Sequence, residues 1–341
     1  MKNITLKELA KQLNLSISTV SKAINDSHEI SNETKQKVKE LVNELNYRPN
    51  IVAKNLKTGR SNTLGLIIPF ITNPFQTQIL EGAQQAAVDH NLNLIFMQSS
   101  ENTKLEEEAV NSMVQQNIDG IIISASANTN EQFLHKMIKQ IPTVLVDRID
   151  FDVPTHRIGV NSEKGAFLAT QHLIEKGRKE IVAITGKNIG VNQKRLSGYK
   201  KALLANYIEY NPANVINVEY GQHTKDMVKN LSIILERKMK DYKNPIGILG
   251  ITDTLTVNTL GILAKLGYRV PEDVSVIGFA NTEYAESLNP SLSSIFQPAN
   301  AMGYQAVEKL LELINHKNSD MDDFDTLYLE TELILRNSTS D

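Results

Sequence analysis

The chain of 341 residues contains no cysteine. It therefore has no disulfide framework, no thiol nucleophile and no zinc or iron–sulfur site with cysteine ligands. The seven histidines are scattered, and none has the H-x-x-x-H spacing of a helical zinc site. None of the apparent strands ends in a G-x-G-x-x-G loop, which argues against a dinucleotide-dependent oxidoreductase. We therefore expect no metal and no cofactor.

Long apolar segments are also missing. The chain has no run of about 18 apolar residues that could span a bilayer. Its first residues, Met1 to Glu8, lack the apolar stretch of a signal peptide. We therefore expect a cytoplasmic protein without membrane contact. With 41% hydrophobic residues the chain can bury a large core, and its length suggests two or three domains.

Charge is unevenly distributed along the chain. Residues 1–60 contain eleven basic and six acidic residues, although the whole chain carries a net charge of −3. Such asymmetry predicts a basic module that meets a polyanion, joined to an acidic body. A lysine-rich surface without a ligand is the alternative.

The basic N-terminal segment has the pattern of three short helices. Thr5 and Glu8 fit a capping box, which starts a first helix over about 6–13. Ser16 is a good N-cap for a second helix, and Ser31 or Asn32 can cap a third. Apolar residues recur at helical spacing in each segment: Leu6, Leu9, Ala10 and Leu13, then Val20, Ala23 and Ile24, then Val38, Leu41, Val42 and Leu45. These stripes predict one small shared core.

The second helix is rich in small polar residues. If Val20, Ala23 and Ile24 face the core, then Ile17, Ser18, Ser21, Lys22 and Asn25 face largely outward. Small hydroxyl side chains let a helix approach the major groove closely, and a lysine can reach guanine or a phosphate. The segment therefore fits a helix-turn-helix unit that binds DNA. A short polar helix without a ligand is the alternative.

After Arg60 the pattern changes to alternating strands and helices. Buried strands are predicted at 63–70, 93–97, 120–125, 143–147, 181–185, 214–218, 246–250 and 274–279. Helical patterns separate them, so two doubly wound parallel sheets are expected. Ligands of such folds bind beyond the carboxyl ends of the strands, here in a cleft between two similar lobes.

The N-terminal sequence ITLKELAKQLNLSISTVSKAINDSHEISNETKQKVKELVNELNYRPNIVAKNL resembles the DNA-binding head of the LacI/GalR family of bacterial transcription regulators. The family pattern joins T-V-S in the second helix to N-Y-x-P-N before a hinge. The resemblance implies that Ile17, Ser18 and Lys22 read bases. Further contacts to phosphates or bases are implied for Thr5, Ser16, Thr19, Ser21 and Asn25. Many family members have arginine where this chain has Lys22, so the operator sequence cannot be copied from a relative.

The segment after the head matches the hinge of that family. Residues 49–57 would form about two helical turns, capped by Asn50 and ended by Gly59. So short a helix is marginal alone in water. The resemblance implies that the hinges of a dimer pair in the minor groove, where Leu56 wedges into the central step. Val52, Ala53 and Lys54 would lie at the helix pair and the groove. An ordinary linker is the alternative.

The resemblance extends over nearly the whole chain and implies a body like the periplasmic sugar-binding proteins. It predicts a DNA-binding domain over 1–48, a hinge over 49–60 and an effector-binding and dimerisation domain over 61–341. The first lobe would comprise about 61–161 plus 291–324, and the second about 162–290 plus 325–341. The chain crosses between lobes near 161, 290 and 325.

Candidate effector-binding residues follow the strands of the body. Phe75 could stack on a sugar face or fill the core, and Asp147 with Arg148 could bind a ligand or form a surface pair. Arg195 matches the ligand-binding arginine of the family. The other candidates are Asn161, Gln222, Asp253 and Asn281. Ala280 replaces an aspartate common in the family, so no known effector can be assumed, and Arg148, Lys187 and Arg195 leave room for an acidic or phosphorylated sugar.

Together these features predict a dimeric repressor of carbohydrate-utilisation genes in the cytoplasm, associated with the nucleoid. It would bind a near-palindromic operator and respond to a sugar-like effector, either as inducer or as corepressor. A transport binding protein has no use for residues 1–60. A glycosidase with Asp147 and Asp253 as paired carboxylates would destroy the signal being sensed, so we expect no enzyme.

Overall fold

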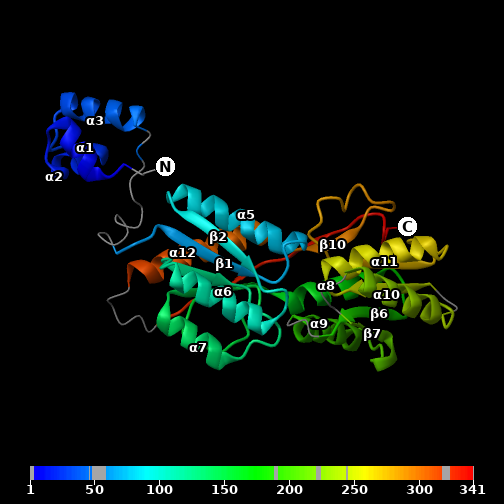
Figure 1. The fold of residues 1–341 in the computed structure, drawn as a ribbon. Coiled ribbons are helices and arrows are strands. Elements are labelled where there is room, and N and C mark those ends of the chain that lie inside the picture. Colours follow the sequence, from blue (N-terminus) through cyan, green and yellow to red (C-terminus); the bar gives the residue numbers. More distant parts are fainter. Residues whose placement is uncertain are drawn as a thin grey trace. The chain divides into compact units, whose positions relative to one another are not determined.

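The computed structural model describes residues 4–45, 47, 59–187, 191–219, 224–242, 245–316 and 323–340. The chain divides into two compact units, Met1–Ser61 and Asn62–Asp341. We call the first unit the head and the second the body, and we describe each by itself (Figure 1). Within the described residues, no helix is long and apolar enough to cross a membrane.

The head is a bundle of three helices, α1 (Leu6–Leu13), α2 (Ile17–Ile24) and α3 (Asn32–Glu44). The predicted caps are present: Thr5 and Glu8 form the capping box, and Ser16 and Ser31 cap α2 and α3. The core consists of Leu9, Ala10, Val20, Ala23 and Val38. Local capping and the apolar stripes thus account for the three-helix head. The expected hinge helix, with Asn50, Val52, Ala53, Lys54 and Leu56, lies outside the described residues.

The first lobe of the body contains a six-stranded parallel sheet of order β11-β5-β4-β3-β1-β2. Its strands are β1 (Thr63–Ile68), β2 (Asn93–Gln98), β3 (Gly120–Ile123), β4 (Thr143–Val146), β5 (Arg157–Val160) and β11 (Thr326–Leu329). Its helices are α5 (Pro74–Asp89), α6 (Thr103–Gln115), α7 (Glu131–Gln140) and α12 (Ala299–Asn315). Side chains alternate between faces, so Leu66 packs with α5 and α12 while Ile67 packs with α6 and α7.

The second lobe contains a six-stranded sheet of order β12-β10-β9-β8-β6-β7. Its strands are β6 (Ile181–Gly186), β7 (Val215–Val218), β8 (Ile246–Gly250), β9 (Val274–Phe279), β10 (Ser293–Phe296) and β12 (Glu332–Ile334). Its helices are α8 (Ser162–Glu175), α9 (Asn192–Ala205), α10 (Thr224–Met239) and α11 (Asp253–Lys265), with a short 3₁₀ turn at Pro212–Asn214. Helices α8 and α9 cover one face, and α10 and α11 cover the other. The two doubly wound lobes are confirmed, with β12 added antiparallel to β10.

Two of the three crossings between lobes lie later in the chain than expected. Strand β10 (Ser293–Phe296) pairs with β9 and stays in the second lobe, and β11 (Thr326–Leu329) pairs with β5 in the first. The chain therefore crosses after Phe296 and after Leu329, rather than near 290 and 325. The expectation failed because β10 and β11 are four-residue strands whose partners are distant in sequence.

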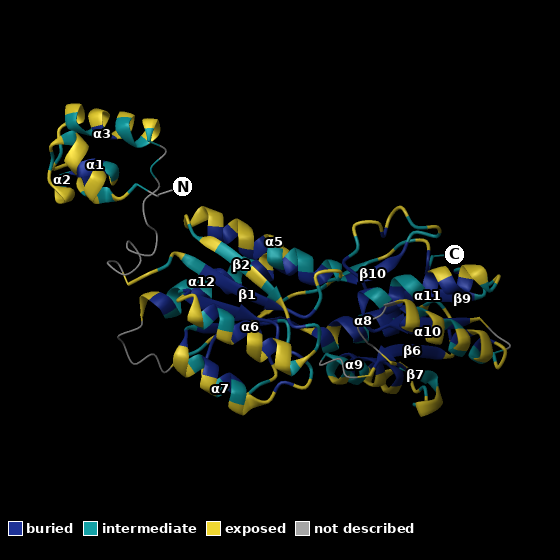
Figure 2. Ribbon diagram, viewed as in Figure 1, coloured by how far each residue is buried: buried dark blue, intermediate teal, exposed yellow. Residues whose placement is uncertain are grey.

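Close packing of two helices joins the crossing segment to the first lobe. A side chain on Gly82 of α5 would come within 1.8 Å of the Asn300 carbonyl, and one on Gly303 of α12 within 2.0 Å of the Ile79 carbonyl. These glycines let the backbones touch, which fixes α12 against α5. Figure 2 shows the resulting buried sheets, covered by helices whose outer faces are exposed.

Candidate functional site: an exposed helix face and an interlobe cavity

Helix α2 presents polar side chains on its outer face. Ile17, Ser18, Lys22 and Asn25 are exposed, whereas Val20 is buried in the head core. The side chain of Ile17 is 48% exposed. The exposed face is the one predicted to read bases, and Ile17 offers an apolar contact of the kind that suits a thymine methyl group.

Several of the predicted DNA contacts also stabilise the helix ends. The Ser16 hydroxyl accepts a hydrogen bond from the Thr19 amide at 3.0 Å, and the Thr5 hydroxyl donates to Glu8 at 3.0 Å. The Asn25 amide donates to the Ser21 carbonyl at 2.8 Å. Lys22 forms an ion pair with Glu29. The hydroxyl of Ser18 has no partner among the described residues, so it can bind a base or phosphate without losing a bond.

A narrow cavity lies between the two lobes of the body. Its walls are the loops and helix starts that follow β1, β2, β4, β6, β8 and β10. It therefore opens where the carboxyl ends of both parallel sheets meet, as expected for this architecture. The cavity volume is about 50 Å³, room for a few water molecules. A ligand of sugar size requires the lobes or the lining side chains to move apart.

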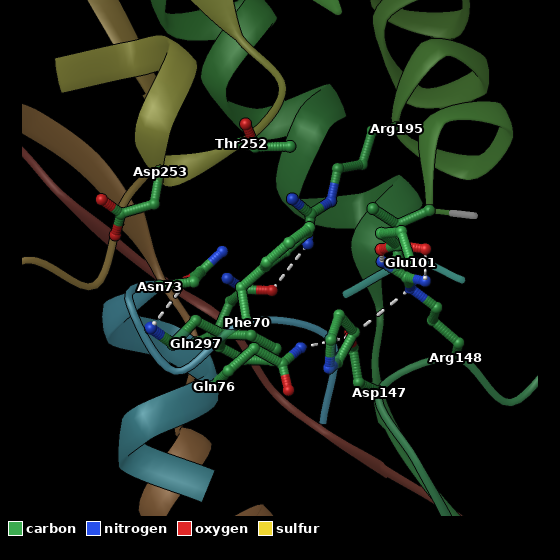
Figure 3. A pocket seen from close by; sticks show the side chains of 13 residues that line it. Phe70, Asn73, Gln76, Glu101, Asp147, Arg148, Arg195, Thr252, Asp253 and Gln297 are labelled. Carbon is green, nitrogen blue, oxygen red and sulfur yellow. Dashed lines mark hydrogen bonds and ion pairs between the residues drawn. The ribbon is translucent and has the colours of Figure 1, made fainter. Parts of the chain in front are cut away.

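One wall of the cavity carries Asp147 and Arg148, which follow β4. Asp147 accepts a hydrogen bond from Gln76 at 3.0 Å (Figure 3). It also accepts one from Ser124 at 3.2 Å, and burial raises the pKa of its carboxyl group. Arg148 donates to the Ala125 carbonyl at 2.9 Å and forms a two-pronged ion pair with Glu101. Two buried polar atoms of this wall, Gln76 Oε1 and Arg148 Nε, have no hydrogen-bond partner within the described residues, although Arg148 Nε lies 4.0 Å from Asp147 Oδ2. They offer an acceptor and a donor to a ligand.

Arg195 enters the cavity from α9 on the second lobe. Its guanidinium donates to the Ile251 carbonyl at 2.6 Å and to Gln297 Oε1 at 2.7 Å, and it lies 3.6 Å from the centre of the Phe279 ring. No carboxylate among the described residues forms an ion pair with it. Burial lowers its pKa to about 10, because the charged form loses hydration. The guanidinium is held by neutral acceptors and an aromatic face.

Asp253 begins α11 at the opposite wall. Its carboxylate accepts a hydrogen bond from the backbone amide of Asn281, and burial raises its pKa to about 6. The residue is 7% exposed, so water stabilises its charge only weakly. The cavity thus holds two carboxyl groups, Asp147 and Asp253, that ionise reluctantly.

The structure brings together five of the eight predicted effector-binding residues. Phe75, Asp147, Arg148, Arg195 and Asp253 all line the cavity, and Phe75 also packs in the core. Asn161 does not line it: the side chain is exposed and caps α8 by accepting from the Lys164 amide at 3.0 Å. Asn281 is buried behind the cavity wall and Gln222 lies outside the described residues. Lys187 pairs with Glu219 at the surface rather than lining the cavity.

Sequence reasoning missed further polar and aromatic lining residues. These are Phe70, Asn73, Gln76, Glu101, Thr252 and Gln297. Most of them follow strands that the pattern did predict, so the strand-end rule could have found them. Gln297 follows β10, which was not predicted as a strand, and no sequence signal pointed to it.

The head and the body together define a class of protein: a DNA-binding transcription regulator whose second unit can enclose a small ligand. A model of the lacI family of bacterial regulatory proteins matches residues 5–50, and a periplasmic binding protein-like domain model matches residues 170–339. The ribose operon repressor of Haemophilus influenzae is 31% identical over 335 residues, which cover 98% of each chain. The chain belongs to the lacI family of bacterial regulatory proteins.

Two solved structures span almost the whole chain. The lac repressor dimer bound to operator and the anti-inducer ONPF has a TM-score of 0.84 and 23% identity, and the match covers 99% of both chains. The complex of the regulator CelR with cellobiose has a TM-score of 0.69 and 26% identity, covering 98% of this chain and 100% of that one. At 23% identity, the likeness to the lac repressor shows a shared fold and nothing more.

Proposed function

We propose that this regulator is a homodimeric, cytoplasmic repressor that binds a near-palindromic operator and responds to a small neutral, polyhydroxylated effector, a sugar or sugar derivative. It would control carbohydrate-utilisation genes and would not act as an enzyme. The observation that carries the proposal is the combination of an exposed polar face on α2 with a polar cavity between two lobes of the same chain. One unit suits DNA and the other suits a small ligand.

The charges of the cavity favour a neutral effector over an acidic one. Arg148 is already engaged by Glu101, and Arg195 is held by three neutral acceptors. The lining also contains the carboxyl groups of Asp147 and Asp253. An anionic ligand could pair with Arg195 only by displacing its neutral acceptors, and it would be repelled by the two carboxyl groups whenever these are ionised. Hydroxyl groups, which both donate and accept, suit Gln76 Oε1 and Arg148 Nε. The names of the ribose operon repressor and of the CelR–cellobiose complex agree with this class.

A second copy of the chain is the partner that we propose for the edge of the first lobe. Strand β2 is an edge strand of its sheet, and Phe96 on it is 44% exposed. Val88 on α5 and Leu105 on α6 are also exposed. An edge strand with apolar neighbours is costly to leave in water, and pairing across a two-fold axis covers it. That symmetry is the one a near-palindromic operator requires.

A thermal-shift screen of the full chain tests the effector class. Neutral mono- and oligosaccharides are compared with their uronic acid and phosphate counterparts at equal concentration. We expect at least one neutral sugar to raise the unfolding temperature, because a ligand that binds only the folded state stabilises it by mass action. Stabilisation by the acidic counterparts alone would contradict the neutral class.

Lys22 gives a test of the DNA-reading face. We expect Lys22→Ala to relax base preference at one or two positions of each half-site, by about 1–3 kcal/mol each. Selection of bound sequences from a random pool measures the preference. Lys37→Ala is the matched control, because Lys37 is an exposed lysine of α3 that also pairs with a glutamate, Glu33. A preference matrix that is unchanged by Lys22→Ala would reduce this residue to a phosphate contact.

A further inference from the structure

A pair of amide side chains links the two lobes of the body next to the cavity. Gln78 on α5 belongs to the first lobe, and Asn281 follows β9 in the second. Gln78 Nε2 donates to the Asn281 carbonyl at 3.0 Å, and Asn281 Nδ2 donates to Gln78 Oε1 at 2.7 Å. Each residue is thus both donor and acceptor towards the other. We call this pair the amide clasp.

The side chain of Asn281 is fully hydrogen-bonded. Its Nδ2 donates also to the Gln297 carbonyl at 2.6 Å, and its Oδ1 accepts from the Gln297 amide at 3.1 Å. Gln297 lies in the segment that crosses between the lobes. Asn281 is 3% exposed, so few other groups could replace these partners. An aspartate has the same shape but cannot donate, and it would face two oxygen acceptors.

The amide clasp is connected to two residues of the cavity wall. The backbone amide of Asn281 donates to Asp253, and Gln297 Oε1 accepts from Arg195. On the same helix as Gln78, Gln76 donates to Asp147. A ligand that displaces the contact made by Asp253 or by Arg195 therefore acts on a group that is hydrogen-bonded to Asn281.

A second link between the lobes is ionic and more exposed. Lys194, next to Arg195, pairs with Asp150, two residues after Arg148, and these side chains are 39% and 56% exposed. Exposed pairs of this kind contribute little and are screened by salt. Asn281 is buried and Gln78 is half-buried, so the amide clasp is better shielded from water than this ion pair.

We propose that Gln78 and Asn281 are positioning residues that hold the two lobes in their closed arrangement and so set the balance between closed and open forms that the effector shifts. The inference rests on the proposed function for its regulatory meaning, whereas the closed arrangement itself is a property of the body. The cavity has room for a few water molecules, and a parting of the lobes that admits an effector would open the clasp. The contacts that the bound effector makes with Arg195 and Asp253 then determine whether the amide clasp forms again.

The absence of cysteine from the chain makes a direct distance measurement straightforward. Glu107→Cys on α6 and Lys229→Cys on α10 place one spin label on an exposed position of each lobe. Pulsed electron paramagnetic resonance on the full chain then reports the distribution of distances between lobes. Dilution with unlabelled chain removes signals between protomers. The measurement needs neither DNA nor effector, so its outcome is independent of whether the proposed function is correct.

The variants separate a clasp from a merely structural contact. We expect Gln78→Met and Asn281→Asp each to increase the population with longer distances by on the order of tenfold, because each removes two or more hydrogen bonds between neutral groups. Gln85→Ala, on the same helix but bonded only to Asp89 within the described residues, should leave the distribution unchanged.

Rescue completes the test. Combining Asn281→Asp with Gln78→Lys places an ammonium group opposite the new carboxylate, and we expect the closed distribution to return. Unchanged distances in both single variants would overturn the proposal, even if their unfolding temperatures fall. Distances that change in Asn281→Asp but not in Gln78→Met would also overturn it, because the effect would then be a local distortion of the loop after β9.

Discussion

Arg195→Met is expected to abolish the response to effector while the body stays folded. Loss of the guanidinium leaves the Ile251 carbonyl and Gln297 Oε1 without their donor, which is destabilising by about 1–3 kcal/mol for each buried acceptor. The substitution also removes a desolvated charge, whose cost is reflected in the pKa of about 10. The two effects oppose each other, so the net change in unfolding free energy should stay within about 2 kcal/mol.

Urea denaturation measures the stability of this variant, and operator titration with and without effector measures its response. Gln193→Met, exposed on the same helix, is the control and should retain the response. If Arg195→Met still responds to the sugar that stabilises the unmodified chain, the effector site lies elsewhere than in the cavity.

Asp253→Asn is expected to stabilise the body increasingly as pH rises from 4 to 7. The pKa of Asp253 in the folded state is raised to about 6, so its favourable contribution is complete below about pH 4 and is lost as pH rises through 6. Asparagine keeps an oxygen for the Asn281 amide but carries no charge. The advantage of the variant should therefore approach about 3 kcal/mol near pH 7.

Unfolding free energies of both chains at pH 4.5, 5.5, 6.5 and 7.5 test this expectation. The difference between the chains isolates Asp253 from the other titrating groups. A difference that stays constant over this range would show that Asp253 ionises normally in the folded state.

The head could be predicted from its sequence almost to the residue. Thr5 with Glu8, Ser16 and Ser31 are local signals that start helices, and Val20 and Val38 lie on stripes that need no distant partner. Eight of the twelve strands that the structure describes in the body were also predictable, because parallel strands buried on both faces are continuous apolar runs. Local chemistry and periodicity determine these elements.

The crossings between lobes and part of the cavity could not be predicted in this way. Strands β10 and β11 owe their position to pairing with β9 and β5, which are adjacent in space but not in sequence. Asn161 and Asn281 both follow strands, yet one caps a helix and the other joins the lobes. The strand-end rule finds the correct edge of the sheet but does not determine which way a side chain points.

Glu101 is a lining residue whose role could not be predicted, because its partner is distant in sequence. It follows β2, yet its importance comes from Arg148, which it meets across 47 positions of sequence. From the sequence alone, the Arg148 guanidinium could bind an acidic effector, but in the structure it is paired with Glu101. The sequence shows that a side chain is charged but not whether another side chain neutralises it. The effector class could therefore be proposed only from tertiary contacts.

Reciprocal binding measurements test the central claim, that a ligand between the lobes controls DNA binding. Operator affinity is measured with and without the stabilising sugar, and sugar affinity is measured with and without operator, both on the full chain. Because coupling free energy is reciprocal, we predict that both affinities change by the same factor, in the same direction. A sugar that binds the body and leaves operator affinity unchanged would contradict the claim.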